Sequence, residues 1–382
     1  MNKCNSIIKY IRVAQATYIR ANGNSTVLST VMNHFDNKPS EEYIQNLIES
    51  GCIYYRQPLS ECKTTPPNPN RIFTNIDLAK DSILKVFFYP RPYSMEHVRC
   101  EDPSKYIIFE NQYFLIVDKP HGLDVGPIVD NYHGNITAII GDYIEKRDNR
   151  KHKLYNPHRI DGPTRGLIVI IKDPDFLKKF NKMIIKNEVS KIYKAFLPKS
   201  SNQNIINPGL YRHYMSPDNV LPKVMVNEKL EKYHECLLQV LNVEEKEISI
   251  PIDIDEVSLD LLQTPINFEQ VGKGDYRKQM KSIPFYVVDI NLITGRTHQI
   301  RAQFSKMGYP LLGDRLYGGK KILDLDQQNS YSGNKNYRKM NQDLGKMIGL
   351  VSHQLSFKCP ITGVDYCFTI KENSYNVNKL KL

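Results

Sequence analysis

The sequence predicts an α+β protein whose main sheet is mixed or antiparallel. Strand-like runs occur in distant parts of the chain, at residues 113–117, 166–171, 191–195 and 284–293, with few helical patterns between them. This spacing favours long-range strand pairing over a regular βαβ repeat. A length of 382 residues leaves room for one large domain and one small one.

The charge balance predicts a polyanionic partner. Lys and Arg number 52 against 41 Asp and Glu, which gives a net charge of +11. Charge alone is also compatible with a merely soluble basic protein, so the motifs must decide. The seven cysteines are scattered and form no Cys-x-x-Cys pair, which favours reduced intracellular thiols over a disulfide framework.

No membrane association is expected, because no apolar run approaches the length of a bilayer span. The first 35 residues contain no Asp or Glu, which mildly resembles a mitochondrial transit peptide. However, residues 7–13 and 16–19 are strand-like, so we interpret them as folded sequence. We expect a cytoplasmic protein, with the mitochondrion or nucleus as alternatives.

Residues 1–90 predict a small basic unit. Apolar spacing predicts helices over 26–35 and 40–50, and Ser40 opens the second helix as a capping residue. Strands are predicted over 52–56 and 82–88. We expect a linker over 91–105, a main domain over 106–370 with insertions or loops at 241–281 and 320–347, and a tail over 371–382.

The first charged cluster of the main domain is the segment HRIDGPTRGLIVII at 158–171. Gly162 and Pro163 predict a turn that places Asp161 at the start of the strand over 166–171. Asp173 and Pro174 then predict a helix that runs to Lys186. The lysines of this helix form either a solvated face or a phosphate-binding stripe.

The second charged cluster follows the strand over 284–293. A turn at Thr294-Gly295-Arg296 leads into a helix capped by Thr297, with Ile300 and Phe304 on its buried side. Arg296, His298 and Arg301 therefore gather near the helix start. An aspartate that meets several arginines in a cleft predicts a binding site for an anionic polymer.

Other chemistries find no support in the motifs. HRID is similar to a kinase H-R-D, but no glycine-rich phosphate loop precedes it and no D-F-G follows. Asp314 replaces the first glycine of a P-loop at 313–320. The ten histidines are dispersed without an H-E-x-x-H motif, so we expect no metal site.

HRID and the segment TGRTHQIRAQFSKMGYPLLGDRLYG resemble the signatures of the RluA family of RNA pseudouridine synthases. The resemblance spans residues 106–319 and, in part, 352–363. It implies the α+β catalytic domain of that family, preceded by an S4-like RNA-binding unit over 1–90. Arg165 departs from the family, which usually has serine there. A likeness to the eukaryotic branch implies tRNA, rather than ribosomal RNA, as the favoured substrate.

Isomerising uridine means breaking the bond from C1′ to N1 and remaking it to C5. One carboxylate can stabilise charge at C1′, attack it, or take a proton nearby, so Asp161 is the predicted catalytic group. A buried arginine would keep this carboxylate ionised, and we expect Arg296 in that role. The resemblance implies that Arg159 fills the stack vacated by the flipped base, and that Tyr193 lies under the base.

The complete expectation is a monomeric, cofactor-free isomerase that acts on RNA. Its alternative is an inactive RNA-binding or RNA-chaperone protein of the same fold. The expected catalytic residues are Asp161, Tyr193 and Arg296, and the expected RNA-binding residues are Arg159, Arg165, Lys178, Lys182, His298 and Arg301.

Overall fold

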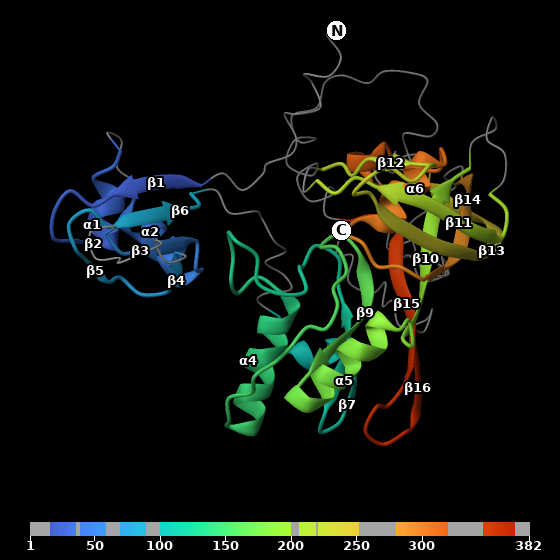
Figure 1. Cartoon of the computed structure of the whole chain (residues 1–382), viewed down its shortest axis with the longest axis horizontal. Helices are drawn as coiled ribbons and strands as arrows, with labels where there is room; N and C mark the ends of the chain where they lie inside the picture. Colours follow the sequence, from blue (N-terminus) through green and yellow to red (C-terminus); the bar gives the residue numbers. More distant parts are fainter. Residues whose placement is uncertain are drawn as a thin grey trace, which may run out of the picture. The chain divides into compact units, whose positions relative to one another are not determined.

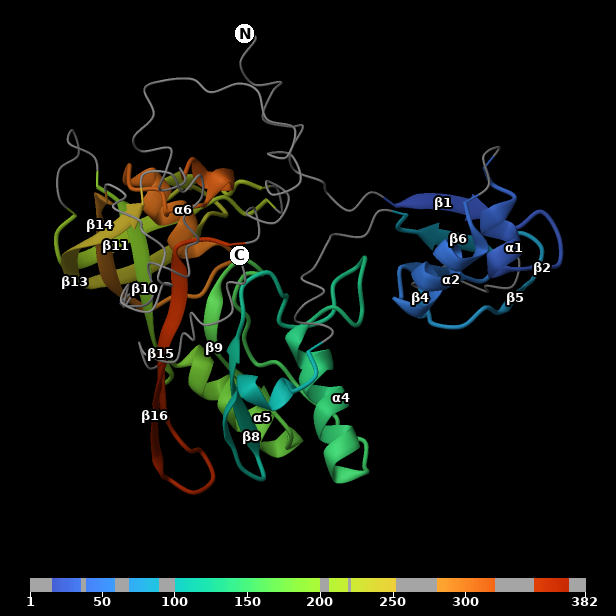
Figure 2. The same ribbon diagram turned by 180° about the vertical axis from the view of Figure 1, so that it is seen from behind.

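The computed structural model describes residues 16–35, 39–58, 69–88, 100–199, 206–218, 221–251, 280–319 and 347–370. They fall into two compact units. Figures 1 and 2 label helices and strands of both units. The first unit lies within Met1–Glu101 and Gly126–Arg150, and the second within Asp102–Val125 and Lys151–Leu382.

The first unit is built on a four-stranded antiparallel sheet with two helices. Its strand order is β1 (Thr17–Arg20), β6 (Ile83–Val86), β3 (Ile53–Arg56) and β4 (Asn70–Ile72). The helices are α1 (Val27–Met32) and α2 (Glu41–Glu49), and β2 (Ser25–Thr26) pairs with β5 (Asp77–Leu78). Ser40 caps α2 by accepting a hydrogen bond from the Tyr43 amide, as its sequence predicts.

These elements confirm both predicted helices and the predicted strands at 52–56 and 82–88. The strand predicted at 7–13, most of the linker and the tail over 371–382 lie outside the described residues. The resemblance to an S4 domain stays a prediction.

The first unit also contains chain that the sequence places in the main domain. The Arg71 guanidinium donates to the carbonyl of Ile128 at 2.6 Å, and its carbon lies 5.4 Å from the ring centroid of Tyr132. The Tyr132 amide in turn donates to Ser50. Helix α4 (Ile136–Asp148) follows, capped by Asn135. Residues 126–150 therefore fold with the N-terminal segment.

The second unit centres on a ten-stranded sheet in the order β12-β11-β13-β14-β10-β15-β9-β8-β7, with β16 paired to β15. Neighbouring strands are antiparallel except β15 and β9, which are parallel. This mixed sheet with few helices confirms the predicted α+β class. The strands are β7 (Ile107–Glu110), β8 (Phe114–Lys119), β9 (Arg165–Ile171), β10 (Ser190–Pro198), β11 (Gly209–Met215), β12 (Met225–Val226), β13 (His234–Pro251), β14 (Met280–Leu292), β15 (Leu350–Lys358) and β16 (Asp365–Thr369).

Short helical segments complete the second unit: η3 (Pro103–Tyr106), α5 (Pro174–Ile185), α6 (Gln299–Lys306) and η6 (Arg315–Tyr317). Residues 241–251, within the predicted insertion, extend β13 along β14, while residues 252–279 lie outside the described part. No helix in the described part of the chain is both long and apolar enough to span a membrane.

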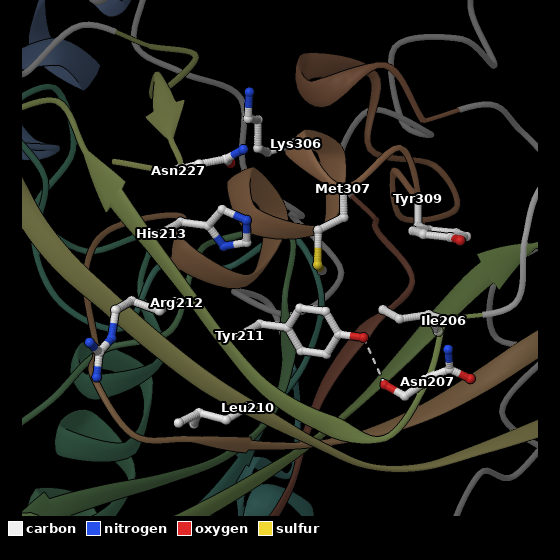
Figure 3. Close-up of a pocket in the computed structure, with 10 residues that line it drawn as sticks. All are labelled: Ile206, Asn207, Leu210, Tyr211, Arg212, His213, Asn227, Lys306, Met307 and Tyr309. Atoms are coloured by element: carbon white, nitrogen blue, oxygen red, sulfur yellow. Dashed lines mark hydrogen bonds between the residues drawn. The ribbon is translucent and has the colours of Figure 1, made fainter. Parts of the chain in front are cut away.

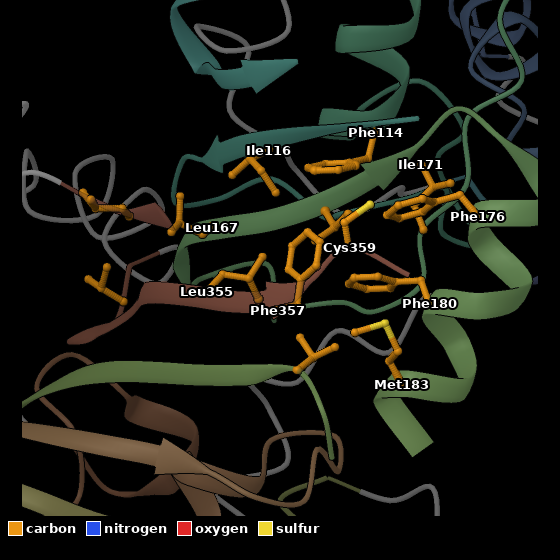
Figure 4. Close-up of a cluster of buried hydrophobic side chains, with 14 of the residues drawn as sticks. Phe114, Ile116, Leu167, Ile171, Phe176, Phe180, Met183, Leu355, Phe357 and Cys359 are labelled. Carbon is orange, nitrogen blue, oxygen red and sulfur yellow. The ribbon is translucent and has the colours of Figure 1, made fainter. Parts of the chain in front are cut away.

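An aromatic core fastens α5 to the sheet (Figure 4). The rings of Phe176 and Phe180 stack with centroids 5.7 Å apart, and Phe180 meets Phe357 of β15 edge to face at 5.0 Å. Phe114 of β8 completes the cluster and is fully buried. This packing holds β9 between β8 and β15, which fixes the strand that follows Asp161.

Gly166 marks a close approach of two strands that no other residue fits. Its φ is +125°, and a Cβ added there would lie 2.4 Å from the carbonyl oxygen of Ser352. We expect Gly166→Ala to destabilise the protein by at least about 2 kcal/mol, because it adds both backbone strain and overpacking. Urea denaturation followed by circular dichroism measures this change.

Gly23→Ala is the matched control, because a Cβ at Gly23 would have no neighbour within 4 Å. It should change stability by less than about 0.5 kcal/mol. Equal stabilities of the two variants would refute the proposed close approach.

Candidate active site

Asp161 lies in the turn that enters β9. Its carbonyl accepts a hydrogen bond from the Thr164 amide at 3.0 Å, which closes the predicted turn. Just before it, the buried ring of His158 accepts a hydrogen bond from the Val169 amide at 3.1 Å. Burial, reinforced by the charge of Lys191, lowers the pKa of His158 to about 3, so the ring stays neutral and can accept. The Asp161 side chain is 14% exposed, so the carboxylate remains accessible from one side.

Arg301 of α6 joins Asp161 to a second carboxylate. Its Nη1 donates to Asp161 Oδ2 at 3.2 Å. Its Nε and Nη2 donate to the two oxygens of Asp314 at 2.7 and 2.8 Å. Burial opposes the charge on Arg301, but the hydrogen bonds and charges of Asp314 and Asp161 outweigh it and raise the pKa of Arg301 above its ordinary value. This buried guanidinium therefore stays charged and favours an ionised Asp161.

The positions of the two arginines reverse our expectation. We predicted Arg296 as the buried partner and Arg301 as an RNA contact. Instead Arg301 is 4% exposed, whereas Arg296 is exposed in the turn before α6 and makes no described side-chain contact with Asp161. The helical register explains this outcome, because Arg301 lies on the side of α6 that faces Asp161, whereas Arg296 precedes the helix.

His298 also lies next to the Asp161 carboxylate. It adopts the left-handed conformation (φ +58°) directly before α6. Its Nε2 lies 3.8 Å from Asp161 Oδ2, and its Nδ1 lies 3.2 Å from the Tyr317 hydroxyl. Burial lowers the pKa of His298 despite the opposing charge of Asp161, so the ring is neutral near pH 7. The 3.8 Å separation is thus a contact with a neutral ring and not an ion pair.

Tyr193 lies in β10, opposite Ser352 of β15, and is 5% exposed. Burial and, to a smaller extent, the charge of Asp161 raise its pKa to about 12, against a hydrogen bond with Ser352 that lowers it. A phenol with this pKa stays protonated at neutral pH. Tyr193 therefore offers a flat ring and a hydroxyl rather than a ready base.

Lys119 is bonded to the turn that carries Asp161, and the sequence analysis gave it no role. Its ammonium is fully buried and donates to the carbonyls of Pro120, Leu123 and Gly162 at 2.9, 2.7 and 3.0 Å. The last acceptor is the residue after Asp161. Burial lowers the pKa of Lys119 to about 7, although Asp124, Asp161 and Asp118 oppose this shift. Lys119 thus ties two loops together beside the carboxylate.

Three predicted RNA-binding residues do not gather with Asp161 as free cations. Arg165 donates two hydrogen bonds to Asp118, at 3.2 and 2.7 Å, so its charge is already paired. Lys178 and Lys182 lie on α5, which follows the far end of β9, and Lys178 is bonded to Asp175. At ~3.3 Å per residue, the seven residues of β9 separate the two ends by about 20 Å.

The site residues that the sequence analysis missed are Lys119, Asp314 and Tyr317. Asp314 and Tyr317 lie in the segment that resembles the RluA family, and Lys119 lies just after the strand predicted at 113–117. The signal available in the sequence was a charged residue next to an apolar run, which predicts that the charge is buried. Among the described residues, no cluster of His, Cys, Asp and Glu has the arrangement of a metal site.

Comparisons with known proteins point to one family. A family described as RNA pseudouridylate synthase matches residues 113–306. The chain is 27% identical over 274 residues to "RNA pseudouridine synthase 6, chloroplastic" of Arabidopsis thaliana. This match covers 71% of this chain and 52% of that protein. It is 24% identical over 222 residues to "Ribosomal large subunit pseudouridine synthase D" of Pseudomonas aeruginosa, covering 58% of this chain and 56% of that protein.

The chain thus spans about half the length of these curated relatives. Among solved structures, "Human RNA Pseudouridylate Synthase Domain Containing 1" has a TM-score of 0.43 and 16% sequence identity, covering 69% of this chain and 82% of that chain.

Arg301 and Arg296 differ in burial, so their loss should differ in cost. Arg301→Gln leaves two carboxylates close together without their guanidinium and should destabilise the protein by about 3–5 kcal/mol. Arg296→Gln removes an exposed charge and should cost less than about 0.5 kcal/mol. Chemical denaturation of both variants measures the difference, and similar losses of stability would disprove the assigned pairing.

Lys119 predicts a pH dependence of stability. Its pKa is about 7 in the folded protein and ordinarily 10.5, so between these values the unfolded chain binds more protons and stability rises with pH. From about pH 6.5 to 8.5, wild type should gain about 2 kcal/mol relative to Lys119→Met. Urea titrations at both pH values test this expectation. Parallel pH profiles of the two proteins would rule out the lowered pKa.

Proposed function

The chain belongs to the RNA pseudouridylate synthase family, and from this membership we propose that it isomerises specific uridines of RNA to pseudouridine. The observation that carries the proposal is the partly exposed carboxylate of Asp161, held by the buried guanidinium of Arg301. Binding a neutral base would not require a carboxylate. Cleavage of the bond at C1′, in contrast, creates positive charge that a carboxylate can stabilise.

The proposed reaction exchanges one bond to C1′ for another. The C1′–N1 bond breaks, the uracil reorients, C1′ bonds to C5, and the proton on C5 is lost while N1 gains one. Asp161 acts at C1′ as a stabilising charge or nucleophile, or accepts a proton nearby. Arg301 holds the carboxylate in place, because its other donors are fixed on Asp314.

Two further side chains have proposed roles in presenting the target. The Tyr193 ring would support the flipped base, and its high pKa favours a hydrogen-bonding phenol over a proton acceptor. Arg159 is exposed two residues before Asp161, where a guanidinium plane can stack in the position that the base leaves. His298 is neutral beside the carboxylate and suits a hydrogen bond with the substrate better than a phosphate contact.

Hydrolysis of the glycosidic bond is the less favoured chemistry. A glycosidase needs a second carboxyl group to protonate the leaving group. Asp314, the other carboxylate that Arg301 binds, does not suit this role, because its side chain is 1% exposed and both of its oxygens accept from Arg301. An inactive RNA-binding protein is also less favoured, because an accessible carboxylate beside Arg159 would weaken its affinity for phosphates.

We propose tRNA as the first substrate to test, on the resemblance to the eukaryotic branch of the family. Large-subunit ribosomal RNA is the second candidate, because the name of the Pseudomonas aeruginosa relative specifies the ribosomal large subunit. We also propose that the protein acts as a monomer in the cytoplasm. Thiols stay reduced in that compartment, which suits seven scattered cysteines. Tritium release from C5-labelled tRNA and ribosomal RNA would distinguish the two substrates.

Asp161→Asn should abolish isomerisation while RNA binding persists. Asparagine keeps the shape of the side chain but loses the charge that acts at C1′, and removing a negative charge does not weaken phosphate contacts. Tritium release from C5-labelled RNA measures activity, and a filter-binding assay measures affinity. Asp175→Asn is the control, because Asp175 is 75% exposed on α5. Activity of Asp161→Asn within about tenfold of wild type, roughly 1.4 kcal/mol, would refute the catalytic assignment.

A further inference from the structure

A cavity in the same unit lies between β11 and the end of α6. It has a volume of about 630 Å³, and its lining includes Tyr211, His213, Lys306 and Tyr309 (Figure 3). Figure 3 shows the rings of Tyr211 and His213 projecting from β11 toward the side of the cavity that carries Met307. The Tyr211 hydroxyl donates to the carbonyl of Asn207 at 2.8 Å, which fixes the orientation of this ring.

Buried amides fix His213 as a hydrogen-bond donor to this cavity. The Arg296 amide donates to Gln299 Oε1 at 3.0 Å, so the nitrogen of the same amide group donates to Gln303 Oε1 at 2.9 Å. Gln303 Nε2 must then donate to His213 Nδ1, which lies 3.1 Å away. A neutral imidazole that accepts at Nδ1 carries its hydrogen on Nε2.

The Nε2–H of His213 has no acceptor within the described part of the chain. His213 is only 8% exposed as a whole, but its Nε2 keeps some accessible surface, so this donor can reach a ligand in the cavity that the ring lines. Burial and the nearby charge of Lys306 lower the pKa of His213, which keeps the ring neutral. The cavity therefore contains an imidazole N–H that faces it and an exposed ammonium nearby, both suited to an oxygen acceptor.

The cavity and Asp161 lie on opposite sides of α6. Arg301 faces Asp161, whereas Gln303 contacts His213. These residues are two positions apart, which turns them about 200° around the helix axis. A helix with its side chains is about 10 Å thick, so one nucleotide cannot fill both places. An occupant of the cavity is therefore not the uridine that reacts.

We propose that this cavity binds a second nucleotide of the substrate RNA, outside the reacting uridine. The inference rests on the proposed function, because it assumes an RNA substrate. The Tyr211 and Tyr309 rings offer stacking surfaces for a base, and Lys306 offers a charge for a phosphate. His213 donates to a carbonyl or phosphate oxygen. Arg212 contributes less, because Glu235 lies 3.3 Å from its guanidinium.

Photo-crosslinking locates the bound nucleotide in whichever RNA the protein selects. Wild-type protein is mixed with total cellular RNA that contains 4-thiouridine, irradiated and digested, and the crosslinked peptides are identified by mass spectrometry. The expected result is a crosslink at Tyr211 or Tyr309 in addition to any near Asp161. Crosslinks confined to the surroundings of Asp161 would overturn the proposal.

Affinity measurements supply the second test. Lys306→Gln should raise the Kd for the same RNA by about fivefold or more and lower the slope of log K against log salt by roughly 0.7. His213→Gln, which keeps an amide donor, should bind better than His213→Phe. Lys358→Gln, which changes an exposed lysine at the end of β15, is the matched control and should leave both quantities unchanged.

The failures of the two proposals can be told apart. If the wild-type protein binds RNA through this cavity but releases no tritium from any RNA, the proposed isomerisation fails and the cavity assignment stands. If tritium is released but Lys306→Gln and Lys358→Gln bind equally well, the cavity assignment fails. Binding of free uridine monophosphate at Tyr211 without any effect of Lys306→Gln on RNA affinity would also overturn it.

Discussion

The position of Arg301 between two carboxylates is the interaction on which the rest of the site depends. Buried charges destabilise a protein unless each finds a partner of good geometry. Arg301 gives two short hydrogen bonds to Asp314 and one longer bond, 3.2 Å, to Asp161. Asp314 therefore orients the guanidinium, and among the described residues Asp161 Oδ1 has no hydrogen-bond donor, which leaves it for a substrate. The two hydrogen bonds to Asp314 fix the guanidinium, and the fixed guanidinium then holds the Asp161 carboxylate.

The fold must bring together site residues that are far apart in sequence. Asp161 enters from β9, Arg301 from the helix after β14, and Tyr193 from β10, while β15 pairs with both β9 and β10. Lys119 adds a second restraint by joining its own loop to the residue after Asp161. Because side chains from separate elements are held by packing and hydrogen bonds, the carboxylate is placed before substrate arrives. Helix α6 carries Arg301 on one side and the amide chain to His213 on the other.

Much of the fold followed from local patterns, whereas the pairing of charges did not. Alternating and continuous apolar runs identified β8, β9 and β14, and the Ser40 cap identified α2. Such signals depend on neighbours in sequence. The partner of Asp161 depends on which side of α6 faces a turn 140 residues away, and the sequence placed Arg296 there instead of Arg301. The pairing of Arg165 with Asp118 could not be predicted for the same reason, because Asp118 comes from the adjacent strand.

The most direct test of the central claim is a map of pseudouridine across cellular RNA. Cells that lack this protein should lose pseudouridine at one or a few discrete uridines. Expression of the wild-type chain should restore them, whereas Asp161→Asn, produced at the same level, should not. Identical maps with and without the protein, or full restoration by the Asp161→Asn variant, would contradict an isomerase that depends on this carboxylate.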